Sequence, residues 1–264
     1  MRTCGFDLRG INMAEVAWYR RRTGMQRLKG KNAIVSGASR GIGRAVAVAL
    51  AAEGASVLAV ARNSVALDHT VAAAEACGGR CLPLLLDVTM DGAAERAVGA
   101  AMQAFGGIDI LINNAGIATS GTVRDTSQVA FHEIMRTNLD ATFLFCQAVI
   151  PHMTVSGGAI VNIASIFGKQ GMAGNAVYSA SKFAVVGLSQ ALFEEVRELG
   201  IKVCCICPGF VNTPMVTDDR NLDRAKMLQA QDVADCVTWV VTSSPTVCPV
   251  EIVLRPQRTP YLRG

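Results

Sequence analysis

Short apolar runs alternate with longer amphipathic runs along most of the chain. The short runs are rich in β-branched residues and resemble strands buried on both faces, whereas the longer runs place apolar residues at helical spacing. Such β-α alternation is typical of a parallel sheet covered by helices on both sides. We therefore expect an α/β fold with a single doubly wound, Rossmann-like domain and a parallel sheet of about seven strands.

The expected elements follow one another in pairs. Strands are predicted at residues 32–36, 56–61, 80–86, 108–113, 159–164, 202–207 and 251–254. Helices are predicted at residues 42–53, 65–77, 91–105, 128–149, 177–199 and 232–241. The polar segment 214–229 follows the sixth strand and is either a mobile lid over a substrate or an ordinary solvated loop. Met172 and Met215 are candidate pocket walls, although methionine more often only fills a core.

Composition supports one domain and argues against a nucleic-acid partner. The 264 residues are 51% hydrophobic, which suffices for a sizeable core, and no Pro/Gly/Ser-rich linker divides them. The net charge is only +4, and residues 1–24 supply +3 of it through five Arg against Asp7 and Glu15. We expect residues 1–24 to be a disordered extension, or to precede a true start at Met25, in preference to an organelle transit peptide. The domain is then residues 25–264.

Neither a membrane span nor a metal site is expected. No stretch approaches the roughly 18 uninterrupted apolar residues of a spanning helix, and no apolar core marks a secretory signal. Of the nine Cys, Cys146, Cys204, Cys205 and Cys207 lie in apolar runs and are predicted to be buried thiols. Cys204 and Cys205 would point to opposite faces of a strand, and no His lies nearby, which disfavours zinc. These features favour a cytoplasmic location.

A glycine-rich turn joins the first strand to the first helix, within the sequence SGASRGIG. Gly37 permits a tight turn, and Gly41 and Gly43 would let the backbone approach a pyrophosphate and the helix pack closely on the sheet. The helix N-terminus offers free N–H groups and partial positive charge to the phosphates. The alternative is a turn without a ligand. The predicted contacts in this turn are Gly37, Ser39, Arg40, Gly41, Ile42 and Gly43.

Two arginines decide the expected form of the dinucleotide. An acidic residue at the end of the second strand usually binds a free ribose 2′-hydroxyl, but here Arg62 and Asn63 follow that strand. Together with Arg40, Arg62 would present two guanidinium groups, which suit a 2′-phosphate. The sequence therefore predicts NADP(H), with solvated surface arginines as the alternative.

Several motifs occur in one order: SGASRGIG at 36–43, Asp87-Val88, NNAG at 113–116, Asn138, Ser165, Tyr178-x-x-x-Lys182, and Pro208-Gly209 followed by Val211 and Thr213. In this order and spacing the chain resembles the short-chain dehydrogenase/reductase family over residues 29–254. The resemblance implies an enzyme that moves a hydride between a nicotinamide and the carbon of a carbonyl or secondary alcohol.

Physical chemistry supports the central pair independently. Tyr178 and Lys182 are four residues apart on a predicted helix and so share one face, about 5–6 Å apart between Cβ atoms. A tyrosine with a pKa near ~10 is a poor base at neutral pH, and a nearby ammonium stabilises its phenolate and lowers that pKa. Ser165 follows the fifth strand, where its hydroxyl can hydrogen-bond the reacting oxygen.

The resemblance assigns roles to the remaining motif residues. It implies that Tyr178 is the proton donor and acceptor, that Lys182 also holds the nicotinamide ribose, that Ser165 orients the substrate oxygen and that Asn138 anchors a water of a proton relay. Asn113 is expected to be structural and to tie neighbouring strands together. The further implied cofactor contacts are Asp87, Val88, Asn114, Ala115, Gly116, Pro208, Gly209, Val211 and Thr213.

The substrate and the assembly remain broader expectations. The last strand reads VEIVLRP, without the Asp-Gly-Gly ending of many reductases of carrier-bound acyl chains, and so favours a small carbonyl or 3-hydroxy acid. A 3-oxoacyl-[acyl-carrier-protein] reductase is the first alternative, and a non-catalytic NADP-binding regulator is an alternative of another class. The two longest helices carry more apolar residues than one sheet face should bury, which predicts a homotetramer or homodimer.

Overall fold

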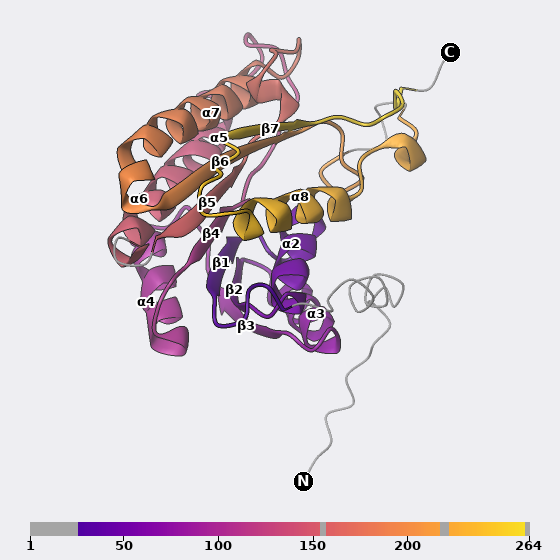
Figure 1. Cartoon of the computed structure of the whole chain (residues 1–264). Helices are drawn as coiled ribbons and strands as arrows, with labels where there is room; N and C mark the ends of the chain where they lie inside the picture. The colour runs from indigo at the N-terminus through magenta and orange to yellow at the C-terminus, as the bar shows by residue number, and fades with distance from the viewer. Residues whose placement is uncertain (1–25, 154–156, 217–221, 262–264) are drawn as a thin grey trace.

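The computed structural model describes residues 26–153, 157–216 and 222–261. It contains a seven-stranded parallel sheet in the order β3-β2-β1-β4-β5-β6-β7 (Figure 1). The order reverses between β1 and β4, which is the doubly wound arrangement expected from the sequence. The strands are β1 Asn32–Ser36, β2 Ser56–Ala61, β3 Arg80–Leu85, β4 Ile110–Asn113, β5 Gly158–Ile163, β6 Ile201–Pro208 and β7 Glu251–Leu254.

Six of the larger helices cover the two faces of the sheet. They are α2 Gly41–Ala52, α3 Ser64–Ala76, α4 Ala93–Phe105, α6 Ala141–Met153, α7 Ala176–Val196 and α8 Ala230–Thr242. Because successive strand residues point to opposite faces, Val35 packs with α2, α3 and α8, whereas Ile34 packs with α4, α6 and α7. Figure 1 shows these two helical layers on either side of the strands.

The helix predicted at residues 128–149 is three elements in the structure. Helix α5 Gln128–Met135 passes into a π-helical turn, Arg136–Asp140, which continues into α6. The hydroxyl of Thr142 donates to the carbonyl of Asn138 at 2.9 Å, so a side chain takes up a carbonyl within this turn. The predicted helix is therefore present as one continuous helical stretch, and only its π-helical turn was not predicted, because hydrophobic spacing does not reveal a single added residue per turn.

The cysteine predictions agree with the packing. Cys204 lies on the sheet face covered by α2 and α8, whereas Cys205 and Cys207 lie on the other face beside α7. Cys146 is buried in the layer formed by α4 and α6. Across the described ranges, no group of three or more His, Cys, Asp or Glu side chains is arranged to hold a metal ion. None of the helices described is long and apolar enough to cross a bilayer.

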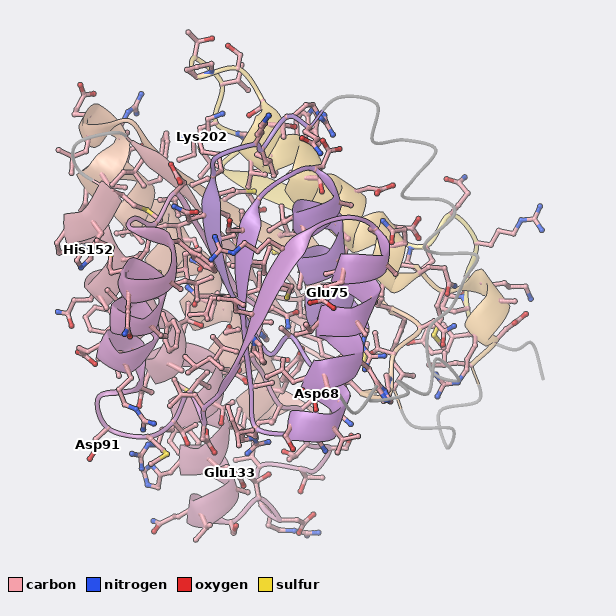
Figure 2. The ribbon with its side chains drawn as sticks, turned by 90° about the horizontal axis from the view of Figure 1, so that it is seen from below. Asp68, Glu75, Asp91, Glu133, His152 and Lys202 are labelled. Carbon is pink, nitrogen blue, oxygen red and sulfur yellow. The ribbon has the colours of Figure 1, made fainter. Side chains whose placement is uncertain are left out.

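The two ends of the sheet have different surroundings. Figure 2 places Lys202, at the start of β6, at one end of the molecule, and Asp91, in the connection after β3, at the other. The glycine-rich turn, the connections after β4 and β5, and the segment after β6 all leave the carboxyl ends of their strands. Ligands of open α/β sheets bind at this edge. The expected N-terminal extension lies outside the described residues.

Candidate active site

The glycine-rich turn is fixed to the end of β4 by a side chain. The amide of Asn114 donates to the carbonyls of Ser36 and Gly37 at 3.1 and 3.2 Å. Gly37 has a φ of +65°, and a Cβ on it would lie 2.8 Å from the Asn114 amide nitrogen and 2.9 Å from the Cα of Ala115. Only glycine fits here, because both the backbone conformation and the space exclude a side chain.

The other two glycines, Gly41 and Gly43, allow α2 to begin close to neighbouring atoms. A Cβ on Gly43 would collide with the Gly37 carbonyl, so this helix can approach the turn only without a side chain. Gly41 has a φ of +54° and faces Thr213. The three glycines therefore let the backbone form a cradle at the N-terminus of α2, which fits the pyrophosphate of a dinucleotide.

Arg44 and Thr70 hold this turn in place through hydrogen bonds to its carbonyl groups. The sequence alone did not indicate either residue. The Arg44 guanidinium donates to the carbonyl of Ser39 at 2.7 Å and to that of Ala66, in α3, at 3.1 Å. The Thr70 hydroxyl donates to the Ala38 carbonyl at 2.9 Å. No local signal marks these residues, because the contacts of Arg44 with Ala66 and of Thr70 with Ala38 span 22 and 32 residues of the chain.

The two predicted cofactor arginines differ in their surroundings. Arg40 precedes the first turn of α2 and is exposed. Arg62 follows β2 and lies 3.4 Å from a carboxylate oxygen of Asp87. Burial raises the pKa of Asp87, but hydrogen bonds from Thr89 and the charge of Arg62 outweigh it and lower that pKa overall. The sequence did not predict this ion pair at the edge of the predicted adenosine site.

Lys182 is buried beneath the predicted catalytic tyrosine. Its ammonium donates to the Ile163 carbonyl at 3.0 Å and lies 5.9 Å from the centre of the Tyr178 ring. Loss of hydration in this buried position lowers the pKa of Lys182 to about 8. The Tyr178 ring also makes an edge-to-face contact with Phe167, with 5.9 Å between ring centres.

Asn138 lies in the π-helical turn with its side chain fully enclosed. The amide oxygen accepts from the Ile117 N–H at 2.8 Å, and the amide nitrogen donates to the Ile117 carbonyl and to the Ser181 hydroxyl, both at 2.9 Å. A Cβ on Gly116 would lie 3.2 Å from this amide oxygen and 3.5 Å from the Lys182 ammonium. Asn138 therefore joins the segment after β4 to α7 beside Lys182.

Ser165 begins a short 3-10 helix, Ile166–Gly168, after β5. Its hydroxyl oxygen accepts from the Phe167 N–H at 3.2 Å. Since the oxygen is an acceptor in this contact, the hydroxyl hydrogen remains available for a substrate oxygen.

A single pocket gathers many of the predicted residues. Those that line it are Ile42, Asn114, Gly116, Ser165, Tyr178, Lys182, Pro208, Gly209, Val211 and Thr213. The other predicted residues lie outside its lining, namely Gly37, Ser39, Arg40, Gly41, Gly43, Arg62, Asp87, Val88, Ala115 and Asn138. Met215 is a pocket wall as expected, whereas Met172 is not. Pocket residues that the sequence did not indicate are Ala118, Ile163, Ala164, Ile166, Phe167, Asn175, Phe210 and Val216.

Asn113 has the structural position that was expected of it. Its buried amide donates at 2.9 Å to the amide oxygen of Asn162, its partner in register on β5. Asn162 in turn donates to the Ser189 hydroxyl on α7 at 2.9 Å. This chain of hydrogen bonds ties two central strands and a helix together beneath the pocket.

The family model of short-chain dehydrogenases matches residues 31–223. The chain belongs to the short-chain dehydrogenase/reductase family. A ketoacyl reductase, HetN, of Nostoc sp. is 36% identical over 226 residues, which cover 84% of this chain and 79% of that protein. A 3β-hydroxysteroid dehydrogenase of Mediterraneibacter gnavus is 35% identical over 221 residues, covering 83% and 80%.

A solved structure supports the same family. A short-chain dehydrogenase of Burkholderia cenocepacia, in complex with NADP, matches with a TM-score of 0.81 and 33% identity. The match covers 87% of this chain and 98% of that one. As a short-chain dehydrogenase/reductase, the protein is an oxidoreductase that acts on alcohol or ketone groups with a nicotinamide cofactor.

Proposed function

We propose that this protein is an NADP(H)-dependent oxidoreductase that interconverts a small carbonyl compound and its secondary alcohol. The observation that carries the proposal is the juxtaposition, in one pocket, of Tyr178, Ser165 and a buried Lys182 beside the segment that follows β6. NADPH, when bound, supplies the hydride for carbonyl reduction. The chain itself then supplies a proton and orients the carbonyl.

In this proposal Tyr178 donates its phenolic proton to the carbonyl oxygen during reduction and takes it back during oxidation. The charge of Lys182 stabilises the phenolate, because a buried ammonium is weakly screened by solvent. Ser165 donates a hydrogen bond to the reacting oxygen and polarises the carbonyl. Asn138 joins the segment after β4 to α7 beside Lys182, and in this proposal it anchors the water of a proton relay.

The proposed cofactor contacts follow from the cradle and the two arginines. The backbone of residues 37–43 would hold the pyrophosphate, and Asp87 and Val88 would flank the adenine. Arg40 and Arg62 would bind the 2′-phosphate, since Arg62 keeps further N–H donors beyond its contact with Asp87. The NADP bound to the Burkholderia cenocepacia relative supports this choice.

The pocket supports a neutral, largely apolar substrate. Among the described residues that line it, Lys182 alone has a charged side chain, and Phe167, Phe210 and Met215 supply apolar walls. Among these described lining residues a substrate carboxylate would find no second cation, so they suit a neutral carbonyl better than a 3-hydroxy acid. The similarity to the Nostoc sp. ketoacyl reductase is the observation that supports the alternative, a 3-oxoacyl reductase.

The test of the mechanism is Tyr178→Phe. This variant keeps the ring and its contact with Phe167 but removes the acidic proton. We expect carbonyl-dependent oxidation of NADPH to fall by at least about 10²-fold, the contribution of a general acid, with little change in NADPH affinity by fluorescence titration. Full activity in Tyr178→Phe contradicts the mechanism. NADPH binding by the wild type, without turnover of diketones, 3-oxo acids, 3-oxoacyl thioesters or quinones, favours the non-catalytic regulator.

The test of the cofactor choice is Arg62→Asp. The new carboxylate would repel a 2′-phosphate and could accept from a free 2′-hydroxyl, so the ratio of kcat/KM for NADPH over NADH should fall by at least about tenfold. Arg80→Asp is a control at another exposed arginine, one that contacts Phe105 and the Ala104 carbonyl. An unchanged ratio in Arg62→Asp, and in a variant that also lacks Arg40, contradicts the choice of NADP.

We further propose a homo-oligomer, a tetramer or dimer, that works in the cytoplasm. Support for assembly comes from an apolar surface on α6 and α7, where Phe143 and Leu144 are 46% and 40% exposed and lie near Leu188. Exposed aromatic and aliphatic side chains in one patch are typical of contacts between subunits.

A further inference from the structure

The wall of the pocket formed after β6 is packed against the segment that follows β7. The Gly209 N–H donates to the Leu254 carbonyl at 2.7 Å, and a Cβ on Gly209 would lie 3.1 Å from Pro256. Further along this segment, an edge-to-face contact joins Tyr261 to Phe210 with 5.6 Å between ring centres. Phe210 lines the pocket, so the segment 255–261 supports that wall from outside.

The same segment also holds the chain that precedes α8. The Asp223 N–H donates to the carbonyl of the buried Pro260 at 2.7 Å, and Leu222 pairs with Tyr261 in an antiparallel bridge. Tyr261 therefore touches the pocket wall through its ring and residue 222 through its backbone.

A third set of contacts links these pieces to the pocket. Arg224 follows Asp223, and its guanidinium donates to the carbonyls of Val216 and Thr213 at 2.7 and 3.4 Å and to the amide oxygen of Asn212 at 3.1 Å. Thr213 and Val216 both line the pocket. The segment 255–261, residues 222–224 and the wall 209–216 thus form one connected unit.

We propose that Tyr261 is a positioning residue that holds Phe210 in the carbonyl side of the pocket, and that the segment 255–261 is a strap that tunes substrate affinity. Phe210 is not among the proposed cofactor contacts, whereas Gly209, Val211 and Thr213 of the same wall are, so loss of the Tyr261 ring should weaken binding of the carbonyl compound more than binding of the dinucleotide. The kinetic part of this inference rests on the proposed function, whereas the packing part does not.

The first experiment measures hydrogen exchange of the backbone amides in residues 209–216 of the full chain. The variants are Tyr261→Ala, a chain that stops after Thr259, and Tyr261→Phe, with Arg258→Ala as a matched exposed control in the same segment. Exchange in 209–216 should accelerate in Tyr261→Ala and more in the shortened chain, and should stay at the wild-type rate in Tyr261→Phe and Arg258→Ala. Unchanged exchange in Tyr261→Ala and in the shortened chain, or equal acceleration in Arg258→Ala, overturns the proposal.

The second experiment separates KM from kcat with 1-phenylpropane-1,2-dione as a neutral probe. Tyr261→Ala should raise KM for the dione roughly two- to tenfold, the factor that corresponds to one aromatic pair, with kcat unchanged and a smaller loss of NADPH affinity. Tyr261→Phe should restore the wild-type KM. A fall in kcat or NADPH affinity at constant KM contradicts the positioning role. If exchange responds as expected while the wild type reduces no carbonyl compound, the packing role of Tyr261 stands and the proposed function fails.

Discussion

At the scale of single residues, the environment of Lys182 governs the expected chemistry. Its position four residues after Tyr178 could be read from the sequence, but its burial and its hydrogen bond to the Ile163 carbonyl could not. Burial makes the ammonium a stronger influence on its neighbours, because solvent screens it less. Burial also lowers the pKa of the ammonium, so its charge is lost at a lower pH.

This loss of charge predicts a pH dependence. The pKa of Lys182 is lowered to about 8 by burial, so its positive charge is present below pH 8 and disappears as the pH rises through that value. We expect kcat/KM for carbonyl reduction, which reports the free enzyme, to decline above about pH 8. Lys169→Ala, a change at a lysine paired with Glu251 outside the pocket, should leave the profile unaltered. A wild-type profile that is flat up to pH 10 would show that Lys182 keeps its charge.

At the scale of elements, the junction of β1 and α2 depends on two glycines in the first turn of the helix, Gly41 and Gly43. Gly43 is a helical residue whose missing Cβ leaves room for the Gly37 carbonyl. Gly99, in α4, is also helical, but a Cβ there would meet no atom within 4 Å. The same substitution at these two positions therefore isolates the effect of close packing.

We expect opposite outcomes for the two alanine variants. Gly43→Ala should lower the midpoint of urea unfolding and weaken NADPH binding at least about tenfold, because the turn must shift to admit the methyl group. Gly99→Ala should raise the free energy of unfolding by about 0.5–1 kcal/mol, since alanine has less conformational entropy to lose in a helix. Equal effects of both variants on NADPH affinity would contradict the cradle described for the turn.

At the scale of the whole molecule, the apolar surface of α6 and α7 determines the expected assembly. Phe143→Glu places a charge on this surface, which should convert the oligomer to a smaller species in light scattering after size-exclusion chromatography. Val65→Glu is the matched control, because Val65 is 65% exposed on α3, outside the apolar surface that contains Phe143. A wild-type chain that is already monomeric, or a Phe143→Glu variant of unchanged mass, would refute the proposed interface.

The sequence by itself determined the α/β class, the pairing of strands with helices and the identity of most motif residues. These features are local: apolar spacing sets each element, and the glycines of residues 37–43 and the Tyr178–Lys182 spacing carry their meaning within one turn or one helix. The alternating burial of Cys204 and Cys205 was predictable for the same reason, because neighbouring strand residues point to opposite faces.

The tertiary structure decided everything that depends on contacts between distant segments. The π-helical turn around Asn138 is stabilised by Ile117 and Ser181, which lie 21 and 43 residues away. The bracing by Arg44 crosses two helices, and the contact between Phe210 and Tyr261 joins segments 51 residues apart. No local pattern encodes such contacts, because each depends on how the chain packs after its elements have formed.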